Sequence, residues 1–187
     1  MLRFSAALLA VAVAAAPLAA QDPTDADVKA VENFQLTTAV LNRMAQVQEN
    51  MYATVKAHPE LAKKYADQRE NKDDDDDAKS IDDMAKKLDR VPEMKAAVIK
   101  AGFTPRSYMI ATMAMFQATM ASAVLDMPGA DKNKLPANAR ANAAFLKAHA
   151  AEFQKMQQRG QEIEKLTRPK SSDDDAPAPD DTTDSGR

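Results

Sequence analysis

Apolar residues recur at helical spacing along most of this chain, and no stretch alternates in the manner of a β-strand. A first long helix is expected from about Thr24 or Asp25 to Ala57. Its apolar stripe comprises Val40, Met44, Val47, Met51 and Val55. Because these residues follow one another at three or four positions, they share one helix face, which indicates a face buried in a bundle.

Prolines and loop-forming residues divide the rest of the chain into further helices. His58 and Pro59 end the first helix, because the residue before a proline avoids the helical region. Pro59 also suits the first turn of a short helix that reaches about Arg69. Charged residues over 70–79, and prolines, Gly and Asn over 126–138, indicate loops. The remaining helices are expected over 80–90, 93–101, 105–125 and 139–166.

The signals for helix ends are strongest around Gly102. Gly102 is a natural left-handed helix terminator, Thr104 can cap the next helix, and Pro105 suits its first position. Ser80 is expected to cap the helix over 80–90 in the same way. The sequence therefore predicts an all-α fold in which three long helices and shorter pieces form an irregular bundle of four or five helices.

The helix over 105–125 carries no charge between Arg106 and Asp126. Its larger apolar residues form a stripe of Met109, Met113, Phe116, Met120 and Val124. A helix that is apolar nearly all round is expected at the centre of a bundle, with this stripe in the core. On that basis Phe116→Ala should cost about 3–5 kcal/mol of stability. A membrane span is the alternative reading, and it is opposed by four polar residues on the helix, Thr112, Gln117, Thr119 and Ser122.

The last long helix, over 139–166, has an apolar set that is expected to face inward. This set comprises Phe145, Leu146, Phe153, Met156, Ile163 and Leu166. His149 lies one turn from two of the aromatic residues, which predicts a half-buried, hydrogen-bonded histidine.

The N-terminal residues 1–20 have the pattern of a secretory signal peptide. Arg3 supplies a positive charge, Phe4–Ala16 is apolar apart from one serine, and small residues lead to Ala20. This apolar stretch falls short of the roughly 20 residues that span a bilayer. We therefore expect cleavage near Ala20, a mature chain that begins at Gln21, and an exported protein that is periplasmic or secreted and has no transmembrane segment.

Charge divides the mature chain into a nearly neutral helical domain over 21–170 and an acidic tail over 171–187. The tail holds six aspartates and one arginine and has no large apolar residue, so burial cannot offset the entropy of ordering it. It is predicted to be disordered. The neutral body lacks the basic surface that nucleic acid requires, so no nucleic-acid partner is expected.

Metal binding is the first chemistry that the residues suggest. The chain has no cysteine, which excludes disulfides and thiolate ligands. The run Asp73–Asp77 matches the first ligands of an EF-hand, but Ala78 and Met84 occupy the positions of its Gly and Glu. The eleven methionines suit copper(I) or a plastic core. Since the spacing does not unite His58 with His149, we expect no metal site and keep metal handling as an alternative.

Catalytic motifs are missing from the sequence. It has no serine in a nucleophile elbow and no glycine-rich phosphate loop. The paired carboxylates fall in charged, solvated segments, where their acidities should be ordinary. We therefore expect no enzyme, no catalytic residues and no cofactor.

The stretch Ala101–Met109, together with the later segments Leu135–Asn138 and Asn142–Phe145, resembles uncharacterised exported bacterial helical proteins. The resemblance covers about a third of the chain, and it implies a periplasmic helical protein without an assigned activity. The function expected is a non-enzymatic binding or envelope-associated role. The alternatives are a periplasmic protein that handles metal through Met, His and Asp, and a protein that binds an apolar ligand or peptide. The pattern specifies neither partner nor oligomeric state.

Overall fold

The computed structural model describes residues 25–62 and 80–167 of the 187-residue chain, and every regular element in these ranges is a helix. The α-helices are α1 (Asp25–Glu32), α2 (Thr38–Ala57), α4 (Ile81–Lys87), α5 (Pro92–Lys100), α6 (Pro105–Asp126), α7 (Ala137–Ala148) and α8 (Ala150–Thr167). Two 3₁₀ helices, η2 (Leu88–Arg90) and η3 (Lys132–Lys134), complete the set. The all-α prediction is confirmed for these residues.

The predicted number of four or five helices is wrong, because the described residues alone form seven α-helices. The first expected helix is broken between α1 and α2. Over 33–37 the chain leaves the helical conformation after a turn at Asn33, and the amide side chain of Asn142 from α7 binds it. Asn142 donates to the carbonyl oxygen of Phe34 (2.8 Å) and accepts from the amide of Leu36 (2.9 Å). These bonds satisfy backbone groups that a continuous helix would otherwise pair within itself.

The last expected helix is also broken, and the break falls at His149. The backbone of His149 leaves the helical region (φ −110°, ψ 33°), so that α7 ends and α8 begins on either side of it. Its ring stacks on Phe145 with the ring centroids 4.3 Å apart. Two long predicted helices therefore become four shorter ones, and each pair meets at an angle that a single straight helix could not provide.

The helix caps predicted at Ser80 and Thr104 and the terminator predicted at Gly102 are confirmed, whereas the helix expected over 80–90 ends as α4 at Lys87 and continues as the 3₁₀ helix η2. The Thr104 hydroxyl accepts from the amide of Ser107 (3.1 Å), and the Ser107 hydroxyl accepts from the amide of Thr104 (2.9 Å), which completes a capping box. The Ser80 hydroxyl accepts from the amide of Asp83 at 3.1 Å. Gly102 adopts the left-handed conformation (φ +85°) that ends the preceding helix.

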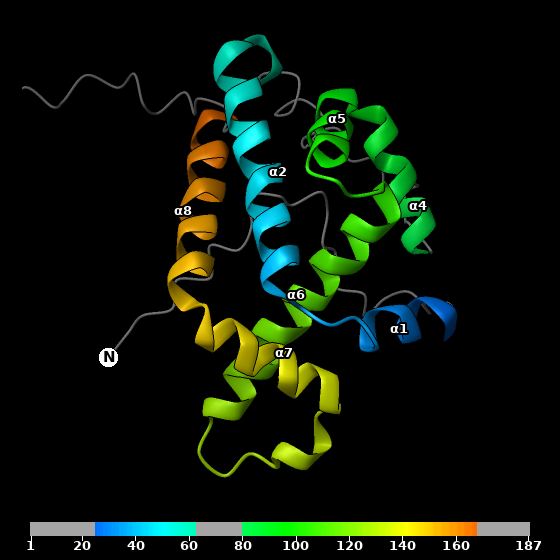
Figure 1. Cartoon of the computed structure of the whole chain (residues 1–187), viewed down its shortest axis with the longest axis vertical. Helices are drawn as coiled ribbons and strands as arrows, with labels where there is room; N and C mark the ends of the chain where they lie inside the picture. The colour runs from blue at the N-terminus through cyan, green and yellow to red at the C-terminus, as the bar shows by residue number, and fades with distance from the viewer. Residues whose placement is uncertain (1–24, 63–79, 168–187) are drawn as a thin grey trace, which may run out of the picture.

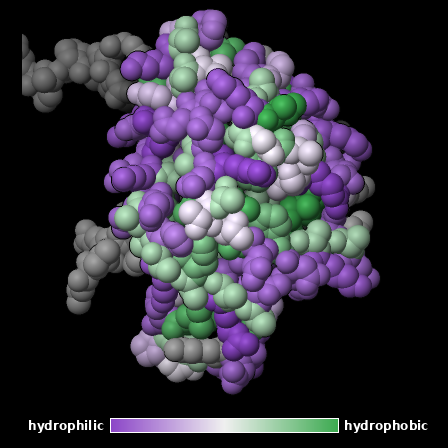
Figure 2. Space-filling view, in the orientation of Figure 1, coloured by the Kyte–Doolittle hydropathy of each residue, from purple (hydrophilic) through white to green (hydrophobic). Residues whose placement is uncertain are grey.

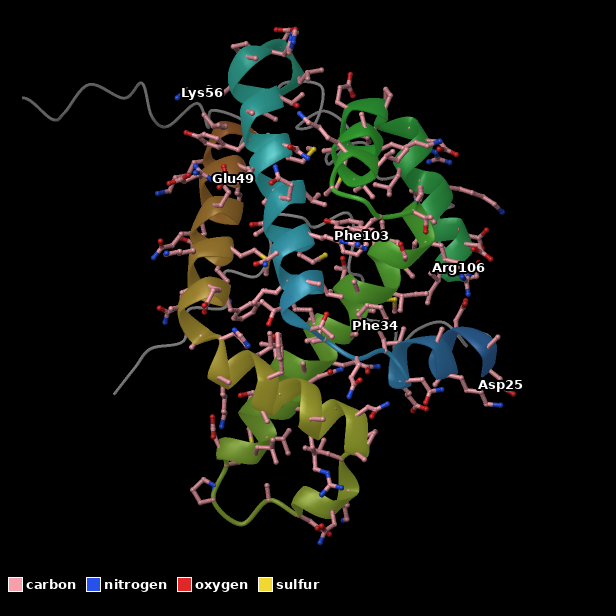
Figure 3. The ribbon with its side chains drawn as sticks, in the orientation of Figure 1. Asp25, Phe34, Glu49, Lys56, Phe103 and Arg106 are labelled. Carbon is pink, nitrogen blue, oxygen red and sulfur yellow. The ribbon has the colours of Figure 1, made fainter. Side chains whose placement is uncertain are left out.

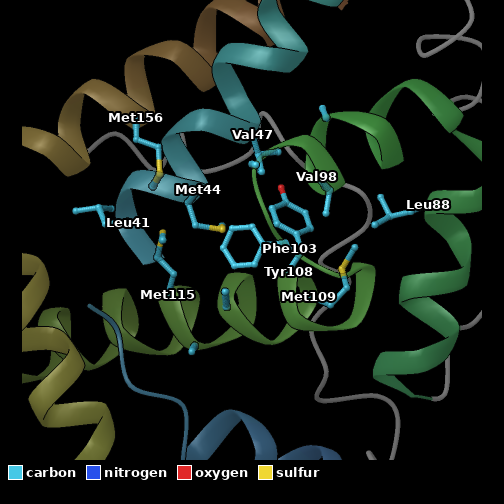
Figure 4. Packing of buried hydrophobic residues seen from close by; sticks show 14 of the residues in the cluster. Leu41, Met44, Val47, Leu88, Val98, Phe103, Tyr108, Met109, Met115 and Met156 are labelled. Atoms are coloured by element: carbon cyan, nitrogen blue, oxygen red, sulfur yellow. The ribbon is translucent and has the colours of Figure 1, made fainter. Parts of the chain in front are cut away.

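The helices are arranged around α6, which crosses the molecule diagonally (Figure 1). α2 and α8 run side by side along one flank, and α4 and α5 lie together at the other (Figure 1). α7 packs against α6, and α1 and α4 also contact α6. The core lies where α2, α5 and α6 meet (Figure 4). Its residues include Met44, Val47, Val98, Phe103, Tyr108 and Met115.

Burial confirms most of the expected inward residues outside α6. In the α2 stripe, Val40 is half-buried and the other four residues are buried. Leu146, Met156 and Ile163 are buried in α7 and α8, and Phe145 and Phe153 are half-buried. Leu166 is 41 % exposed, so its expected place in the core is wrong. Four predicted segments lie outside the described residues: the leader, most of the helix after Pro59, the run Asp73–Asp77 and the acidic tail.

Candidate binding face on helix α6

The N-terminal end of α6 is fixed by charge. Arg106 donates to the carboxylate of Asp27 on α1 (2.8 Å) and pairs with Asp82 on α4 (2.6 Å). Hydrogen bonds to Asp82 and Asp27 raise the pKa of Arg106 above its usual value. Asp27 is buried and also accepts from the amide of Ile81, at the start of α4 (2.9 Å). Figure 3 shows Arg106 between α4 and α1, so this one group of contacts ties three helices together.

The C-terminal end of α6 is tied to α7. The Nζ of Lys147 donates to the carboxylate of Asp126 at 2.5 Å. Gly129 then takes a left-handed conformation (φ +80°) in the turn that leads back along α6. Between Arg106 and Asp126 the helix is uncharged, so only its apolar and small polar side chains decide which face lies inward.

The face of α6 that packs into the molecule is lined mainly by small residues. Ala111, Ala114, Ala118 and Ala121 are each at most 3 % exposed. Tyr108 and Met115 are buried on the same side. Small side chains let neighbouring backbones approach closely, and α6 makes extensive contact with α7. The inward face therefore combines these alanines with Tyr108 and Met115, whereas Phe116 and Met120 are exposed on the opposite side.

The stripe that is expected in the core is only partly buried, and the expectation is corrected for Phe116 and Met120. Met109 is buried at the N-terminal end, and Met113 and Val124 are half-buried. Phe116 is 50 % exposed and Met120 is 53 % exposed. Hydropathy could not separate the two faces, since alanine and methionine are both apolar. The spacing of the alanines at three and four residues was the signal in the sequence that could have identified the inner face.

We call the residues Met113, Phe116, Met120, Ala123 and Met127 the outer stripe. They follow one another at intervals of three or four residues, and Met127, directly after the helix, is 58 % exposed. In the space-filling view, hydrophobic residues gather around the C-terminal end of α6 between hydrophilic borders (Figure 2). Helix α6 is long and apolar enough to cross a membrane by length and composition, a test that the core helix of a soluble protein also passes.

The histidines and carboxylates of the described residues do not form a comparable site. His58 directly follows α2, whose C-terminal end is at the top in Figure 1. His149 directly precedes α8, whose N-terminal end lies at the opposite end of the α2–α8 pair. His58 contacts Glu60 (3.1 Å), and His149 is 4.0 Å from Glu152, too far for the hydrogen bond expected of it. Within residues 25–62 and 80–167, no group of three or more His, Asp or Glu residues is placed to hold a metal ion.

The structure therefore provides one candidate surface, the outer stripe, and no assembled set of reactive groups in the residues it describes. The outer stripe can bind a partner by burying apolar surface, because its methionine, phenylalanine and alanine side chains carry no acid, base or nucleophile. Comparison of the chain with protein families, with curated proteins and with solved structures gave no match.

Proposed function

We propose that this chain is an exported, non-enzymatic binding protein that holds an apolar partner on the outer stripe of α6. The observation that carries the proposal is the exposure of Phe116, Met120 and Met127 in one line, while alanines of the same helix are buried. Single exposed apolar residues are common on protein surfaces, but a continuous line of large ones is typical of an interaction site.

The composition of the outer stripe supports binding and indicates the kind of partner. Methionine is flexible and polarisable, so a methionine-rich surface adapts to partners of different shape. Phe116 supplies the large rigid group that usually contributes most to such contacts. Because α6 has no charge between Arg106 and Asp126, a charged partner would find no counter-ion along the stripe. The partner that fits is apolar.

Export is the second part of the proposal, and the leader pattern over 1–20 supports it. N-terminal sequencing of protein recovered from the cell envelope or the medium tests it. We expect the mature chain to begin at Gln21. Soluble protein that retains Met1 would contradict the export.

The binding role is tested with a fluorescent apolar dye such as Nile red and the mature chain. Phe116→Glu and Met120→Glu place charges on the outer stripe, at positions exposed enough to tolerate them. We expect the wild type to enhance the dye fluorescence and both variants to lose most of it. Ile99→Glu is the matched control, because Ile99 on α5 is 54 % exposed but lies outside the stripe. Wild-type protein without dye binding, or an equal loss in the control, would overturn the proposal.

A further inference from the structure

We infer that the outer stripe binds the outer stripe of a second copy of this chain, with the two α6 helices antiparallel. The inference rests on the proposed function, because it names the partner that the apolar surface takes. It is carried by the spacing of the stripe, by the distribution of charge on α6 and by the sizes of the side chains that the pairing brings together.

The spacing of the outer stripe is that of a seam between two helices. From Met113 to Met127 the intervals are three, four, three and four residues, in the order 113, 116, 120, 123 and 127. Apolar residues that alternate at three and four positions face a partner helix at a small crossing angle, as in coiled coils. An apolar small molecule would not require a line of this length, so the partner that matches the seam is a helix.

The charge on α6 favours a copy of itself over other partners and over a membrane surface. The partner helix must be uncharged along its contact face, and α6 is uncharged between Arg106 and Asp126. Helices that lie on membranes carry Lys and Arg on their polar face, whereas the polar residues within this stretch of α6 are Ser, Thr and Gln. The acidic tail over 171–187 has no large apolar residue with which to cover the stripe.

Helix polarity selects the antiparallel orientation, because the charges of Arg106 and Asp126 are already paired within each chain. In an antiparallel pair the positive N-terminal pole of each α6 lies beside the negative C-terminal pole of the other, whereas a parallel pair would place like poles together.

The antiparallel register that centres the pair between Phe116 and Met120 also matches side-chain sizes. Phe116 then faces Met120 of the second copy, which gives two symmetric contacts between sulfur and an aromatic ring. Met113 faces Ala123 of the second copy, so that a long side chain meets a short one. The symmetry is the twofold kind that is commonest among homodimers.

The size of the outer stripe predicts a weak dimer. A stable interface buries about 800 Å² on each partner. The stripe has three large side chains that are about half exposed, and these cover less than that area. Association should therefore depend on concentration, with the monomer dominant at low micromolar concentration and the dimer appearing toward millimolar concentration.

Sedimentation equilibrium of the mature chain, from about 1 µM to about 1 mM, tests the association. We expect the average mass to rise toward twice the monomer for the wild type and for Ile99→Glu. We expect Phe116→Glu to stay monomeric while its circular dichroism and melting temperature remain those of the wild type. A wild type that is monomeric throughout, or a Phe116→Glu variant that dimerises equally, would overturn the inference.

Cysteine crosslinking tests the orientation, and the absence of native cysteine makes each product unambiguous. Met113→Cys and Ala123→Cys proteins are mixed and mildly oxidised. The antiparallel register predicts a disulfide between the two different variants, with little product from either variant alone. Efficient crosslinking of Ala123→Cys to itself would indicate a parallel pair and contradict the inference.

The dye experiment separates failure of this inference from failure of the proposed function. If the wild type is monomeric and its dye binding depends on Phe116, the proposed apolar binding role stands and the inference of a second copy as its partner fails. A monomeric wild type that instead sediments with uncharged phosphatidylcholine vesicles, in a manner that depends on Phe116, would identify a lipid surface in place of the second copy. A monomer that binds neither dye nor vesicles would overturn both.

Discussion

Asn142 holds the junction between α1 and α2 through two hydrogen bonds of its side-chain amide. Its nitrogen donates to Phe34 and its oxygen accepts from Leu36, and the residue is only 4 % exposed. Asn138, one turn earlier, donates to the carbonyl oxygen of Glu32 (2.8 Å) in a more exposed setting. The two asparagines bind the backbone of the junction, while Leu36 is buried in the core and Phe34 packs against it.

We expect Asn142→Ala to lower the free energy of unfolding by about 2–4 kcal/mol, because the buried amide of Leu36 and the partly buried carbonyl of Phe34 would lose their partners together. Asn142→Asp should also destabilise, since a carboxylate cannot donate to Phe34. Asn138→Ala is the control and should cost about 1 kcal/mol or less, because water can replace its bond. Urea unfolding of the three variants measures the difference. Equal losses at positions 138 and 142 would contradict the role given to Asn142.

Tyr108 gives the core a dependence on alkaline pH. Burial raises the pKa of Tyr108 from 10.0 to about 12. A folded-state pKa above the unfolded value favours the neutral hydroxyl form in the folded protein. Its contribution is therefore complete below pH 10 and is lost as the pH rises toward 12. The loss reaches roughly 2 to 3 kcal/mol for a shift of about two pKa units.

Tyr108→Phe should remove this dependence. We expect the difference in unfolding free energy between wild type and variant to be constant from pH 7 to pH 9. From pH 10 to pH 11.5 the wild type should lose stability faster than the variant. Titration of tyrosine absorbance in the folded protein gives a second measurement, in which one of the three tyrosines should ionise late. Parallel stability curves over the whole range would contradict the prediction.

At the scale of elements, the sequence predicts helix ends that depend on neighbouring residues and misses those that depend on distant ones. The caps at Ser80 and Thr104 and the terminator Gly102 act within a few residues, so a local pattern identifies them. The junction after α1 is bound by Asn142, 106 residues away from Leu36. Its one local signal is Thr37, whose hydroxyl accepts from the amide of Val40 and caps α2, although one continuous helix is predicted there. The all-α class was therefore predictable from local patterns, whereas the number of helices was not, because it also depends on contacts between distant residues.

The inner and outer faces of α6 show the corresponding limit for the candidate site. The sequence identifies α6 as the most apolar helix, but it does not show which apolar residues lie inward. Tyr108, Met115 and four alanines are buried, whereas Phe116 and Met120 are exposed, and this division depends on how neighbouring helices pack against α6. The sequence therefore shows the stripe that we propose for binding, but it does not show that Phe116 and Met120 lie outside the core.

Alanine substitutions at the adjacent positions 115 and 116 test which side chain of α6 contributes to the core. Phe116→Ala should change the free energy of unfolding by about 1 kcal/mol or less, because a half-exposed ring leaves no closed cavity. Met115→Ala should cost about 2–5 kcal/mol, since Met115 is 3 % exposed in the core. Chemical unfolding at a protein concentration below the onset of association compares them. A large fall in the free energy of unfolding for Phe116→Ala would indicate that Phe116 is buried, as the sequence alone predicts.

At the scale of the whole molecule, the described helices pack around one hydrophobic core. We expect deletion of Ser171–Arg187 to change the free energy of unfolding by no more than about 0.5 kcal/mol, because the segment has no large apolar residue to bury. Thermal unfolding of the full and shortened mature chains measures this. A clear fall in melting temperature on deletion would show that the tail packs on the body and would contradict the disorder predicted for it.

The hydrogen bonds of Asn142 also determine when the fold can be completed during synthesis. They join residues separated by 106 and 108 positions, and the Arg159–Glu49 bond between α8 and α2 joins residues 110 positions apart. Contacts of such long range form only when both partners have left the ribosome. The N-terminal segments therefore wait, without their final partners, until the last third of the chain is made. This delay is compatible with the export that we propose, because a chain that passes through a translocation channel from its N-terminus must enter it unfolded.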